Sequence, residues 1–359
     1  MRVKLEDVCE RGSSNIKQSD IIKMSGNYPI YGASGLAGKV NFYHQEQPYV
    51  AVVKDGAGIG RTTLNPAKSS VIGTMQYLIP KKNVLPEYLF YVVSYMHLEK
   101  YYTGATIPHI YFKDYKNEEF NLDNIEKQLE IIDVLGRCKK VIEARKQELV
   151  ELDSLTKARF VELFGNIKEE QLLGEISEFV TVGIANSATH AYVESGVPML
   201  RNQNIKENYL DDSDLIYIKP EFAAKYESKK LKENDIIAMR TGYPGVACLV
   251  PKKYEGCQTF TTLIVRLKEN NNPSYVCSYI NSDLGKRYID SEKVGVAQQN
   301  IGAKSLAQMP IKIAPKELQD EYATFVKQVD KSKFDIMTFA PIYAIINLYL
   351  HAHFYKGRR

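Results

Sequence analysis

Glycine-rich stretches beside a cation are the first residues of this sequence whose types and spacing could do chemistry. The stretch "YPIYGASGLAGKV" at residues 28–40 has three glycines before Lys39, as a phosphate-binding loop would. Such a loop requires G-x-x-x-x-G-K followed by Ser or Thr, because the first glycine shapes the turn and the hydroxyl holds magnesium. Ala33 and Val40 stand at those two positions, and Arg61 interrupts the G-x-G-x-x-G spacing of "DGAGIGRT". The sequence therefore does not predict a nucleotide site.

Acidic residues near a lysine offer a second chemistry, the magnesium-dependent cleavage of nucleic acid. Asp211 and Asp212 lie about 15 residues before Glu227 and Lys229, and carboxylates of this kind can hold a metal ion that activates water. A solvated charged face is the more ordinary role of such residues. A nuclease that uses Asp212, Glu227 and Lys229 is the less favoured interpretation and remains the alternative function. The sequence contains no H-E-x-x-H or N-P-P-aromatic motif, so we expect no other catalytic residues and no metal site.

The composition limits the classes of protein to which the chain can belong. Among 359 residues, 47 are basic and 43 acidic, which gives a formal charge of +4, so a polyanion would have to be bound by local patches. The five cysteines include no C-x-x-C pair, which argues against a disulfide framework or a zinc site and for a cytoplasmic location. The uncharged run from Ile336 to Leu350 has 15 residues, fewer than the roughly 20 that a membrane helix needs.

The chain contains an internal duplication. The stretch "YYTGATIPHIYFKDYKNEEFNLDNIEKQLEI" matches "SEKVGVAQQNIGAKSLAQMPIKIAPKELQDEY". Four pairs, each displaced by 191, are Gly104 and Gly295, Ile110 and Ile301, Lys113 and Lys304, and Gln128 and Gln319. Upstream, "AVVKDGAGIG" matches "IIAMRTGYPG", which aligns Lys54 with Arg240 and Gly56 with Gly242. A repeat of this length is a duplicated domain, not a solenoid unit, and duplex DNA offers two similar sites to such a pair of modules.

Each copy must position its loops with the same order of elements. Short β-rich runs between Gly, Pro and Asn turns come first and helical periodicity follows. Residues 124–164 contain no proline, and Leu135, Ile142 and Leu149 recur at sevens, joined by Leu152 and Leu163. This stripe predicts a helix that packs on another helix and is roughly 60 Å long. The fold class is therefore α/β (α+β), with domains predicted at 1–122, a long helix at 123–165, a second β-rich domain at 166–314, a shorter helix at 315–335 and an apolar tail at 336–359.

Loop residues of both copies have the types that read DNA. Each copy has a cation followed by glycine-rich turns and then Thr or Tyr. Glycine loops let backbone N–H groups approach phosphates, while Arg and Lys pair with phosphate or guanine and Asn and Gln with adenine. The candidate DNA contacts are Tyr31, Ser34, Lys39, Lys54, Arg61 and Thr62 in the first copy, and Arg201, Asn202, Gln203, Arg240, Thr241 and Tyr243 in the second.

The duplicated signature resembles that of a known family. "GVAQQNIGAKSLAQMPIKIAPKELQDEY" and its weaker twin are similar to the segments that close the target-recognition domains of specificity subunits in type I restriction–modification systems. "YPIYGASGLAG" followed by "VAVVKDGAGIGR" is similar to the N-terminal half of the same family. The resemblance covers residues 1 to 334 and includes the motif, its duplication and the long helix between the copies, in that order.

The resemblance implies a non-catalytic DNA-recognition subunit with two target-recognition domains, each reading half of a bipartite sequence. Its spacer helices would form an antiparallel coiled-coil pair and dock two methyltransferase subunits, to which restriction subunits add. The residues that we assign to the docking helix on this basis are Leu135, Ile142, Leu149, Leu152 and Leu163. The chain itself would bind no cofactor. S-adenosylmethionine, ATP and Mg²⁺ would belong to the partner subunits, in the cytoplasm and without a membrane anchor.

Two segments depart from the family pattern. A polar residue follows the Gly-small pair of the signature as Gln298 in the second copy, but Ile107, Pro108 and His109 replace it in the first. A structural role is therefore expected for that stretch. The sequence after Asp335 loses its charged amphipathic character, which suggests a frameshift or a recombined end that impairs methyltransferase docking. A decayed scaffold without useful DNA reading is accordingly a second alternative.

Overall fold

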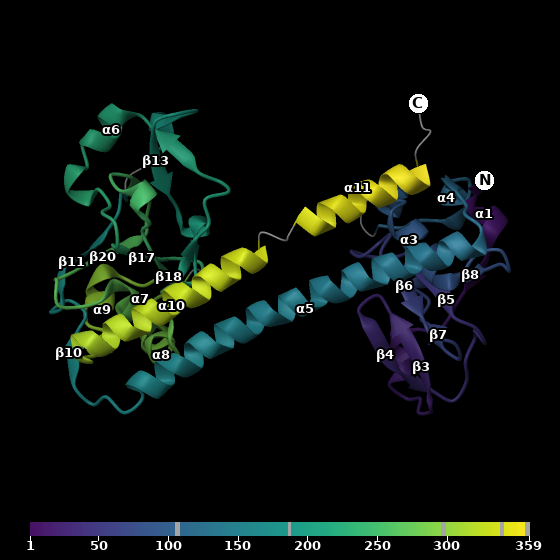
Figure 1. Cartoon of the computed structure of the whole chain (residues 1–359), viewed down its shortest axis with the longest axis horizontal. Coiled ribbons are helices and arrows are strands. Elements are labelled where there is room, and N and C mark those ends of the chain that lie inside the picture. The colour runs from purple at the N-terminus through teal and green to yellow at the C-terminus, as the bar shows by residue number, and fades with distance from the viewer. Residues whose placement is uncertain (105–107, 186–187, 296–298, 338–340, 356–359) are drawn as a thin grey trace. The chain divides into compact units, whose positions relative to one another are not determined.

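Two compact units make up the chain, and α5 (Ile125–Phe164) passes from one into the other (Figure 1). The computed structural model describes residues 1–104, 108–185, 188–295, 299–337 and 341–355. Unit 1 comprises Met1–Gln147 and Ile336–Arg359, and unit 2 comprises Glu148–Asp335. The C-terminal segment thus belongs to the same unit as the N-terminus.

A four-stranded antiparallel sheet in the order β2-β8-β5-β6 is the scaffold of unit 1. One of its two inner strands, β5, reads "YVAVV" and is buried along its whole length. Its β-branched valines favour a strand that is covered by other residues. A second sheet has the order β4-β3-β7, in which β3 and β7 are parallel, and a small pair joins β1 to β9. The strands are β1 (Arg2–Lys4), β2 (Cys9–Ser13), β3 (Tyr28–Gly32), β4 (Gly35–Val40), β5 (Tyr49–Val53), β6 (Thr62–Asn65), β7 (Ser70–Val71), β8 (Met75–Pro80) and β9 (Glu119–Asn121). The helices are α1 (Leu5–Val8), α2 (Gln18–Ile21), α3 (Pro86–Ser94) and α4 (Phe112–Tyr115).

Unit 2 repeats this topology. Its main sheet has the order β11-β20-β17-β18, its second sheet β12-β16-β13-β19 again contains a parallel pair, and β10 pairs with β21 as β1 does with β9. The strands are β10 (Glu170–Leu172), β11 (Ser177–Val182), β12 (Tyr192–Val193), β13 (Val197–Leu200), β14 (Ile205–Lys206), β15 (Tyr209–Leu210), β16 (Ile216–Ile218), β17 (Ile236–Ala238), β18 (Ala247–Leu249), β19 (Gln258–Thr259), β20 (Leu263–Leu267) and β21 (Pro310–Lys312). The helices are α6 (Pro220–Ala224), α7 (Pro273–Asn281), α8 (Asp283–Glu292) and α9 (Ala303–Ala307). The duplication read from the sequence is thus a duplication of fold.

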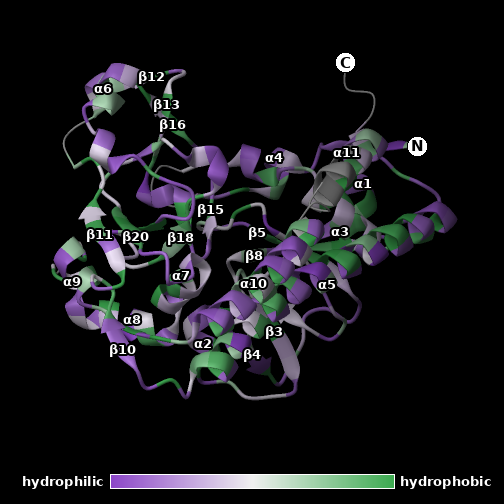
Figure 2. Cartoon of the chain, turned by 60° about the vertical axis from the view of Figure 1, so that its left-hand side comes forward, coloured by the Kyte–Doolittle hydropathy of each residue, from purple (hydrophilic) through white to green (hydrophobic). Residues whose placement is uncertain are grey.

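The long predicted helix is a single α-helix of 40 residues, α5. Hydrophobic and hydrophilic residues alternate along it and along α10 (Lys316–Met337), which has 22 residues (Figure 2). In unit 2 the two helices run antiparallel, since Arg159 of α5 pairs with Glu321 at 2.5 Å and Asp153 pairs with Lys333 at 2.5 Å. The second spacer helix is shorter than the first, as the sequence predicts.

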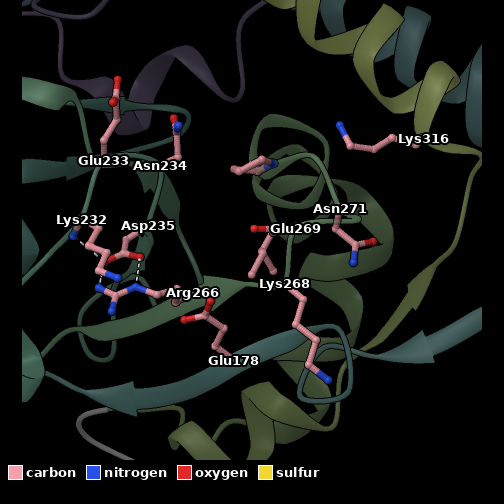
Figure 3. A pocket seen from close by; sticks show the side chains of 12 residues that line it. Glu178, Lys232, Glu233, Asn234, Asp235, Arg266, Lys268, Glu269, Asn271 and Lys316 are labelled. Carbon is pink, nitrogen blue, oxygen red and sulfur yellow. Dashed lines mark hydrogen bonds and ion pairs between the residues drawn. The ribbon is translucent and has the colours of Figure 1, made fainter.

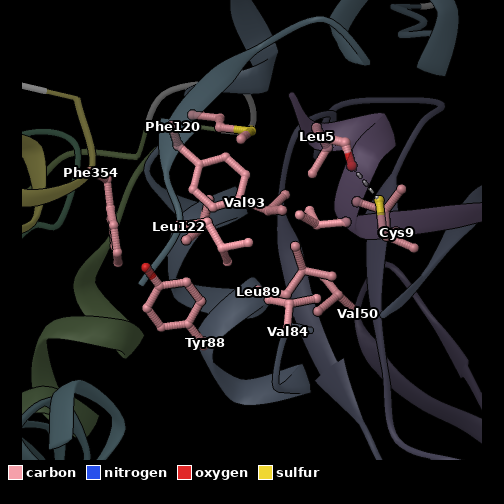
Figure 4. Packing of buried hydrophobic residues seen from close by; sticks show 14 of the residues in the cluster. Leu5, Cys9, Val50, Val84, Tyr88, Leu89, Val93, Phe120, Leu122 and Phe354 are labelled. Atoms are coloured by element: carbon pink, nitrogen blue, oxygen red, sulfur yellow. Dashed lines mark hydrogen bonds between the residues drawn. The ribbon is translucent and has the colours of Figure 1, made fainter. Parts of the chain in front are cut away.

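The apolar tail, which the sequence analysis takes as foreign to the repeat, is part of the core of unit 1. It forms α11 (Pro341–Tyr355), whose Leu350 and Phe354 are buried with α3 and β9 residues. The Phe354 ring lies edge-on to Tyr88, with 5.4 Å between ring centroids (Figure 4). His353 contributes two further links, because its carbonyl accepts from the Asn121 amide at 3.0 Å and its Nε2 lies 2.7 Å from an Asp123 oxygen.

The tail packs an aromatic side chain into the core of unit 1, as the end of α5 does in unit 2. Phe164 packs on Tyr275 at 4.4 Å between ring centroids, as Phe354 packs on Tyr88. The last residue of α11, Tyr355, is displaced by 191 from the last residue of α5, Phe164, which is the displacement of the whole C-terminal repeat. The structure therefore gives the tail a role that the frameshift hypothesis does not anticipate. Within the described part of the chain, no helix combines the length and apolarity that crossing a bilayer demands.

A buried glutamine joins each sheet domain to its spacer helix. Gln128 of α5 has no exposed surface; its Oε1 accepts from the Leu85 N–H at 2.9 Å, and its Nε2 donates to the carbonyls of Asn83 and Asp123 at 3.0 and 2.9 Å. Leu85 is the residue before α3, so the glutamine ties the starts of two helices together.

The repeat partner of this residue, Gln319, makes two of these three bonds in unit 2, as far as the structure describes it. It accepts from the N–H of Asn272, the residue before α7, at 2.8 Å and donates to the Ala314 carbonyl at 2.8 Å. The first N–H groups of a helix have no partner inside the helix. If they are buried without another acceptor, the folded state loses stability. The two glutamines satisfy them at aligned positions.

Replacing Gln128 by methionine should lower the free energy of unfolding of unit 1 by about 1–3 kcal/mol, because buried backbone groups at Leu85, Asn83 and Asp123 lose their partner. Urea unfolding followed by circular dichroism measures this difference. The control is Gln18→Met, at an exposed glutamine of the same unit, with an expected effect within about 0.5 kcal/mol. Equal effects at the two positions would contradict the assigned role.

Candidate nucleic-acid interface

The glycine loop of unit 1 follows the central strand β5 and is held against two other segments. Its backbone bonds to the segment after Gly104, with Gly56 N–H donating to the Pro108 carbonyl at 3.0 Å and Ile110 N–H donating to the Lys54 carbonyl at 2.9 Å. At its other end, the Arg61 guanidinium donates to the Ala33 carbonyl at 3.0 Å, which brings the β3–β4 turn alongside.

These contacts assemble part of the predicted set. Lys54, Arg61 and, through its neighbour Ala33, Ser34 lie around one loop. Thr62 begins β6 and its hydroxyl donates to the Gly60 carbonyl at 3.2 Å. Tyr31 is half-buried against the core of the unit, and Lys39 is exposed on β4. In the part of unit 1 that the structure describes, no hydrogen bond connects the side chain of either residue to the loop.

An ion pair at this loop escaped the sequence analysis. His109 Nδ1 lies 2.6 Å from Asp55 Oδ1, and Lys54 Nζ lies 3.3 Å from the other oxygen of the same carboxylate. Because a carboxylate only accepts, Nδ1 carries the proton. The His109 ring stacks on Tyr111, with centroids 6.4 Å apart, and Tyr111 is half-exposed. Of the stretch that was expected to be structural, Pro108 and His109 contact this loop, while Ile107 and Gln298 of the second copy lie outside the described residues. The only signal in the sequence was the alignment of its segment with the second copy.

The corresponding loop of unit 2 gathers Asn202, Arg240 and Thr241. The Asn202 amide donates to the Thr241 hydroxyl at 2.9 Å, and its carbonyl oxygen accepts from the Arg240 N–H at 3.4 Å. Tyr243 projects from the same loop with 76 % of its surface exposed. Gly242 between them has φ +83° and Gly56 of unit 1 has φ +93°. These values explain why both aligned positions carry glycine.

Arg201 and Gln203 are tied to an acidic residue instead. Arg201 donates to the Asp214 carbonyl and carboxylate, both at 3.0 Å, and Gln203 Nε2 also donates to that carboxylate. The sequence analysis did not foresee this role of Asp214. Their donors face an anion of the chain itself, so both side chains would have to leave Asp214 before they could contact a base or phosphate.

The residues of the nuclease alternative do not form a metal site. The Asp212 carboxylate accepts from Lys253 and from Tyr254, and these hydrogen bonds, the Lys253 one first, lower the pKa of Asp212. Glu227 pairs with Lys230 at 2.7 Å, and Lys229 donates to the Gly183 carbonyl at 2.9 Å. Across the residues that the structure describes, no cluster of His, Cys, Asp or Glu could hold a metal ion.

A hollow of unit 2 also has balanced charge. It has a volume of about 320 Å³ and lies beside β20, where Arg266 donates to both oxygens of Asp235 at 2.8 and 2.7 Å (Figure 3). Four cations and four carboxylates line it: Lys232, Arg266, Lys268, Lys316, Glu178, Glu233, Asp235 and Glu269. Such a balance does not favour a polyanion, so the glycine loops remain the candidate interface.

Comparison with known proteins identifies the domain type. A family model described as "Type I restriction modification DNA specificity domain" matches residues 1–153 and again residues 168–343. No curated protein sequence matches the chain.

The fold is similar to that of solved structures. One is the type I restriction-modification system S subunit from M. genitalium, with a TM-score of 0.61 and 14 % identity, over 98 % of this chain and 94 % of that chain. Another comes from a structure on complex assembly and conformational transition of the type I R-M system, with a TM-score of 0.58 and 14 % identity, over 98 % and 97 %.

Replacing Gly242 by alanine should strain the loop of unit 2 and lower its free energy of unfolding by about 1–2 kcal/mol, because a side chain disfavours positive φ. The opposite sign is expected for Gly136→Ala in α5, where an added Cβ meets no atom within 4 Å and helix propensity should raise stability by about 0.5–1 kcal/mol. Urea unfolding curves of both variants check the pair. A stabilising Gly242→Ala would mean that the loop does not need this conformation.

Proposed function

The chain belongs to the family of type I restriction modification DNA specificity domains, a family that recognises DNA sequence and is not itself catalytic, and we propose that its two units read the two halves of one bipartite target. The observation that carries this proposal is the pair of matching loops. Each follows the strand at the centre of its sheet, places a cation (Lys54 or Arg240) at the start and continues with a glycine of positive φ. Two such loops in one chain suit a duplex that is contacted at two places.

The bases are read, in this proposal, by side chains at the loops, and the loop backbone and other cations contact phosphates. In unit 2 the best-placed reader is Arg240, whose guanidinium can pair with N7 and O6 of guanine. In unit 1 the candidates are Lys54 and Arg61, with His109 beside them. Nothing favours the nuclease alternative, because its residues have separate partners.

Other subunits supply the chemistry, and the spacer helix α5 offers them a docking face. Of the five residues predicted to dock a partner, Leu135 lies in the core of unit 1 and Leu163 packs on the core of unit 2. The other three, Ile142, Leu149 and Leu152, are half-buried. Val134, Val141 and Leu155 are instead about half-exposed, and they form an apolar stripe at heptad spacings along α5. We place the methyltransferase contact on this stripe, since exposed apolar side chains in register mark an interaction face.

The remaining assignments follow from this division of labour. S-adenosylmethionine would be bound by the methyltransferase subunits, and ATP and Mg²⁺ by restriction subunits that join them. This chain would bind none of the three. The proposed location is the cytoplasm, where such a complex meets DNA. The observation that suggested a decayed scaffold was the altered tail, and that tail is packed in the core of unit 1. The tail therefore no longer supports this alternative.

Mapping methylated bases across the genome, with and without this gene, tests the function, and Arg240→Ala sharpens the test. The wild-type gene should produce one two-part methylated sequence. The variant should lose discrimination at one base pair of one half, equivalent to about 1–3 kcal/mol at that position. Lys252→Ala, at an exposed lysine of the same unit, is the control.

Three outcomes of this mapping bear on the proposal. If no methylation depends on this gene, only the decayed-scaffold alternative remains. A uniform loss of methylation in Arg240→Ala would mean that Arg240 contacts phosphate. A change in both halves of the sequence would contradict the assignment of one half to each unit.

The docking face is tested by Val141→Asp, which should reduce the methyltransferase that co-purifies with the chain by about 10- to 100-fold, since the partner would have to bury a charge in place of an apolar side chain. Val150→Asp is the matched control, because Val150 is also exposed but lies nine residues along α5, on the opposite face. Equal losses in the two variants would indicate that the partner does not choose this stripe.

A further inference from the structure

We propose that Asn202 is a positioning residue for Arg240 and does not itself read a base. This inference rests on the proposed function and revises the role that the residue type suggests. An asparagine next to a DNA-reading loop would ordinarily be assigned to adenine, which it contacts through both its oxygen and its nitrogen. In unit 2 both of those atoms are already engaged within the chain.

The Asn202 amide has a defined orientation. Its Oδ1 faces the backbone N–H of Arg240 at 3.4 Å, and its Nδ2 faces the Thr241 hydroxyl at 2.9 Å. Because a backbone N–H can only donate, the oxygen must be the atom on that side. A bidentate contact with adenine through the same lone pair and the same N–H would break both bonds and release the loop.

The effect of these bonds is to fix the backbone of Arg240 on both sides. Its N–H is bound by Asn202, and its carbonyl accepts from the Ile301 N–H at 3.1 Å. The loop closes at Gly245, where an added Cβ would lie 2.2 Å from Ile289 Cδ1. Arg240 is therefore presented from a rigid point, which reduces the ordering that DNA binding would have to impose.

Unit 1 supports this role through its aligned residue, Lys54. The Ile110 N–H donates to the Lys54 carbonyl at 2.9 Å, as Ile301 does to Arg240. The Lys54 N–H, however, donates to the backbone carbonyl of Thr74 at 2.9 Å. The Thr74 carbonyl in unit 1 and the Asn202 side chain in unit 2 thus both accept from the N–H of the aligned cation. The Thr74 carbonyl has a structural role at this position, which supports the same role for Asn202.

The Arg240 side chain is correspondingly free for a ligand. Its Nε is buried and has no partner, and within the described residues nothing accepts a hydrogen bond from its guanidinium. Buried donors are rarely left unpaired, because they lose their hydrogen bonds to water without a replacement. Arg201 and Gln203 already face Asp214. The Nε of Arg201 is also buried without a partner, but its terminal nitrogen is held by Asp214, so Arg240 is the residue of this cluster that gains most from an acceptor on DNA.

The test is a double-mutant cycle on the full-length chain, bound to the methyltransferase that co-purifies with it. Affinity is measured for the target found by methylation mapping and for duplexes with each base pair substituted in turn. Asn202→Ala and Thr241→Val should each weaken binding by about 3- to 10-fold for every duplex, as the loss of one ordinary hydrogen bond does. The double variant should bind no more weakly than either single variant. Thr241→Ser keeps the hydroxyl and should bind like wild type.

Two results would overturn the proposal. One is a changed preference at a single base pair in Asn202→Ala, which would make the asparagine a reader. The other is additivity of the two variants, which would show that they act separately. If Asn202→Ala fails to fold, the comparison of Thr241→Val with Thr241→Ser decides the question. A wild-type complex that prefers no sequence would instead defeat the proposed function, and this inference with it.

Discussion

Buried backbone groups at the junction between sheet domain and spacer helix are the constraint on which the rest of the structure depends. Each unit brings two helix starts together inside its core, and the N–H and carbonyl groups there cannot reach water. Gln128 and Gln319 solve this with a side chain that both accepts and donates. Each spacer therefore leaves its unit with its first turn fixed. These hydrogen bonds fix the sheet domain on its spacer helix, so the side chains of the glycine loops are not needed for that purpose.

The sequence predicted the parts of the fold that leave local or repeated signals. Heptad spacing and the absence of proline predicted α5, and the duplication predicted that the sheets would match. The packing of the tail was not predicted because its contacts are non-local, since His353 bonds to Asn121 and Asp123 across more than 200 residues. Periodicity also cannot say what an apolar stripe faces. Leu135 and Val141 both lie on α5, and only the folded unit buries the first and exposes the second.

The candidate site was predictable in its residue types but not in its partners. Gly56 and Gly242 do have the positive φ that a glycine turn implies. Acidic neighbours, by contrast, were missed, because Asp214 holds Arg201 from 13 residues away and Asp55 meets His109 from 54 residues away. Whether a cation is available to DNA depends on such contacts. Residue type alone therefore cannot separate the candidates whose donors are paired within the chain, as those of Arg201 and Gln203 are with Asp214, from the others.

The two units also show how one scaffold can read different sequences. Their loops share the main-chain bond from Ile110 or Ile301 to the aligned cation, and this bond does not depend on side chains. Around it the side chains differ. Unit 1 pairs Lys54 with a carboxylate, whereas no described residue of unit 2 accepts a hydrogen bond from the Arg240 guanidinium. A carboxylate beside a cation weakens its attraction to phosphate and penalises partners that offer no compensating donor. The two loops are thus similar in backbone but different in side-chain chemistry.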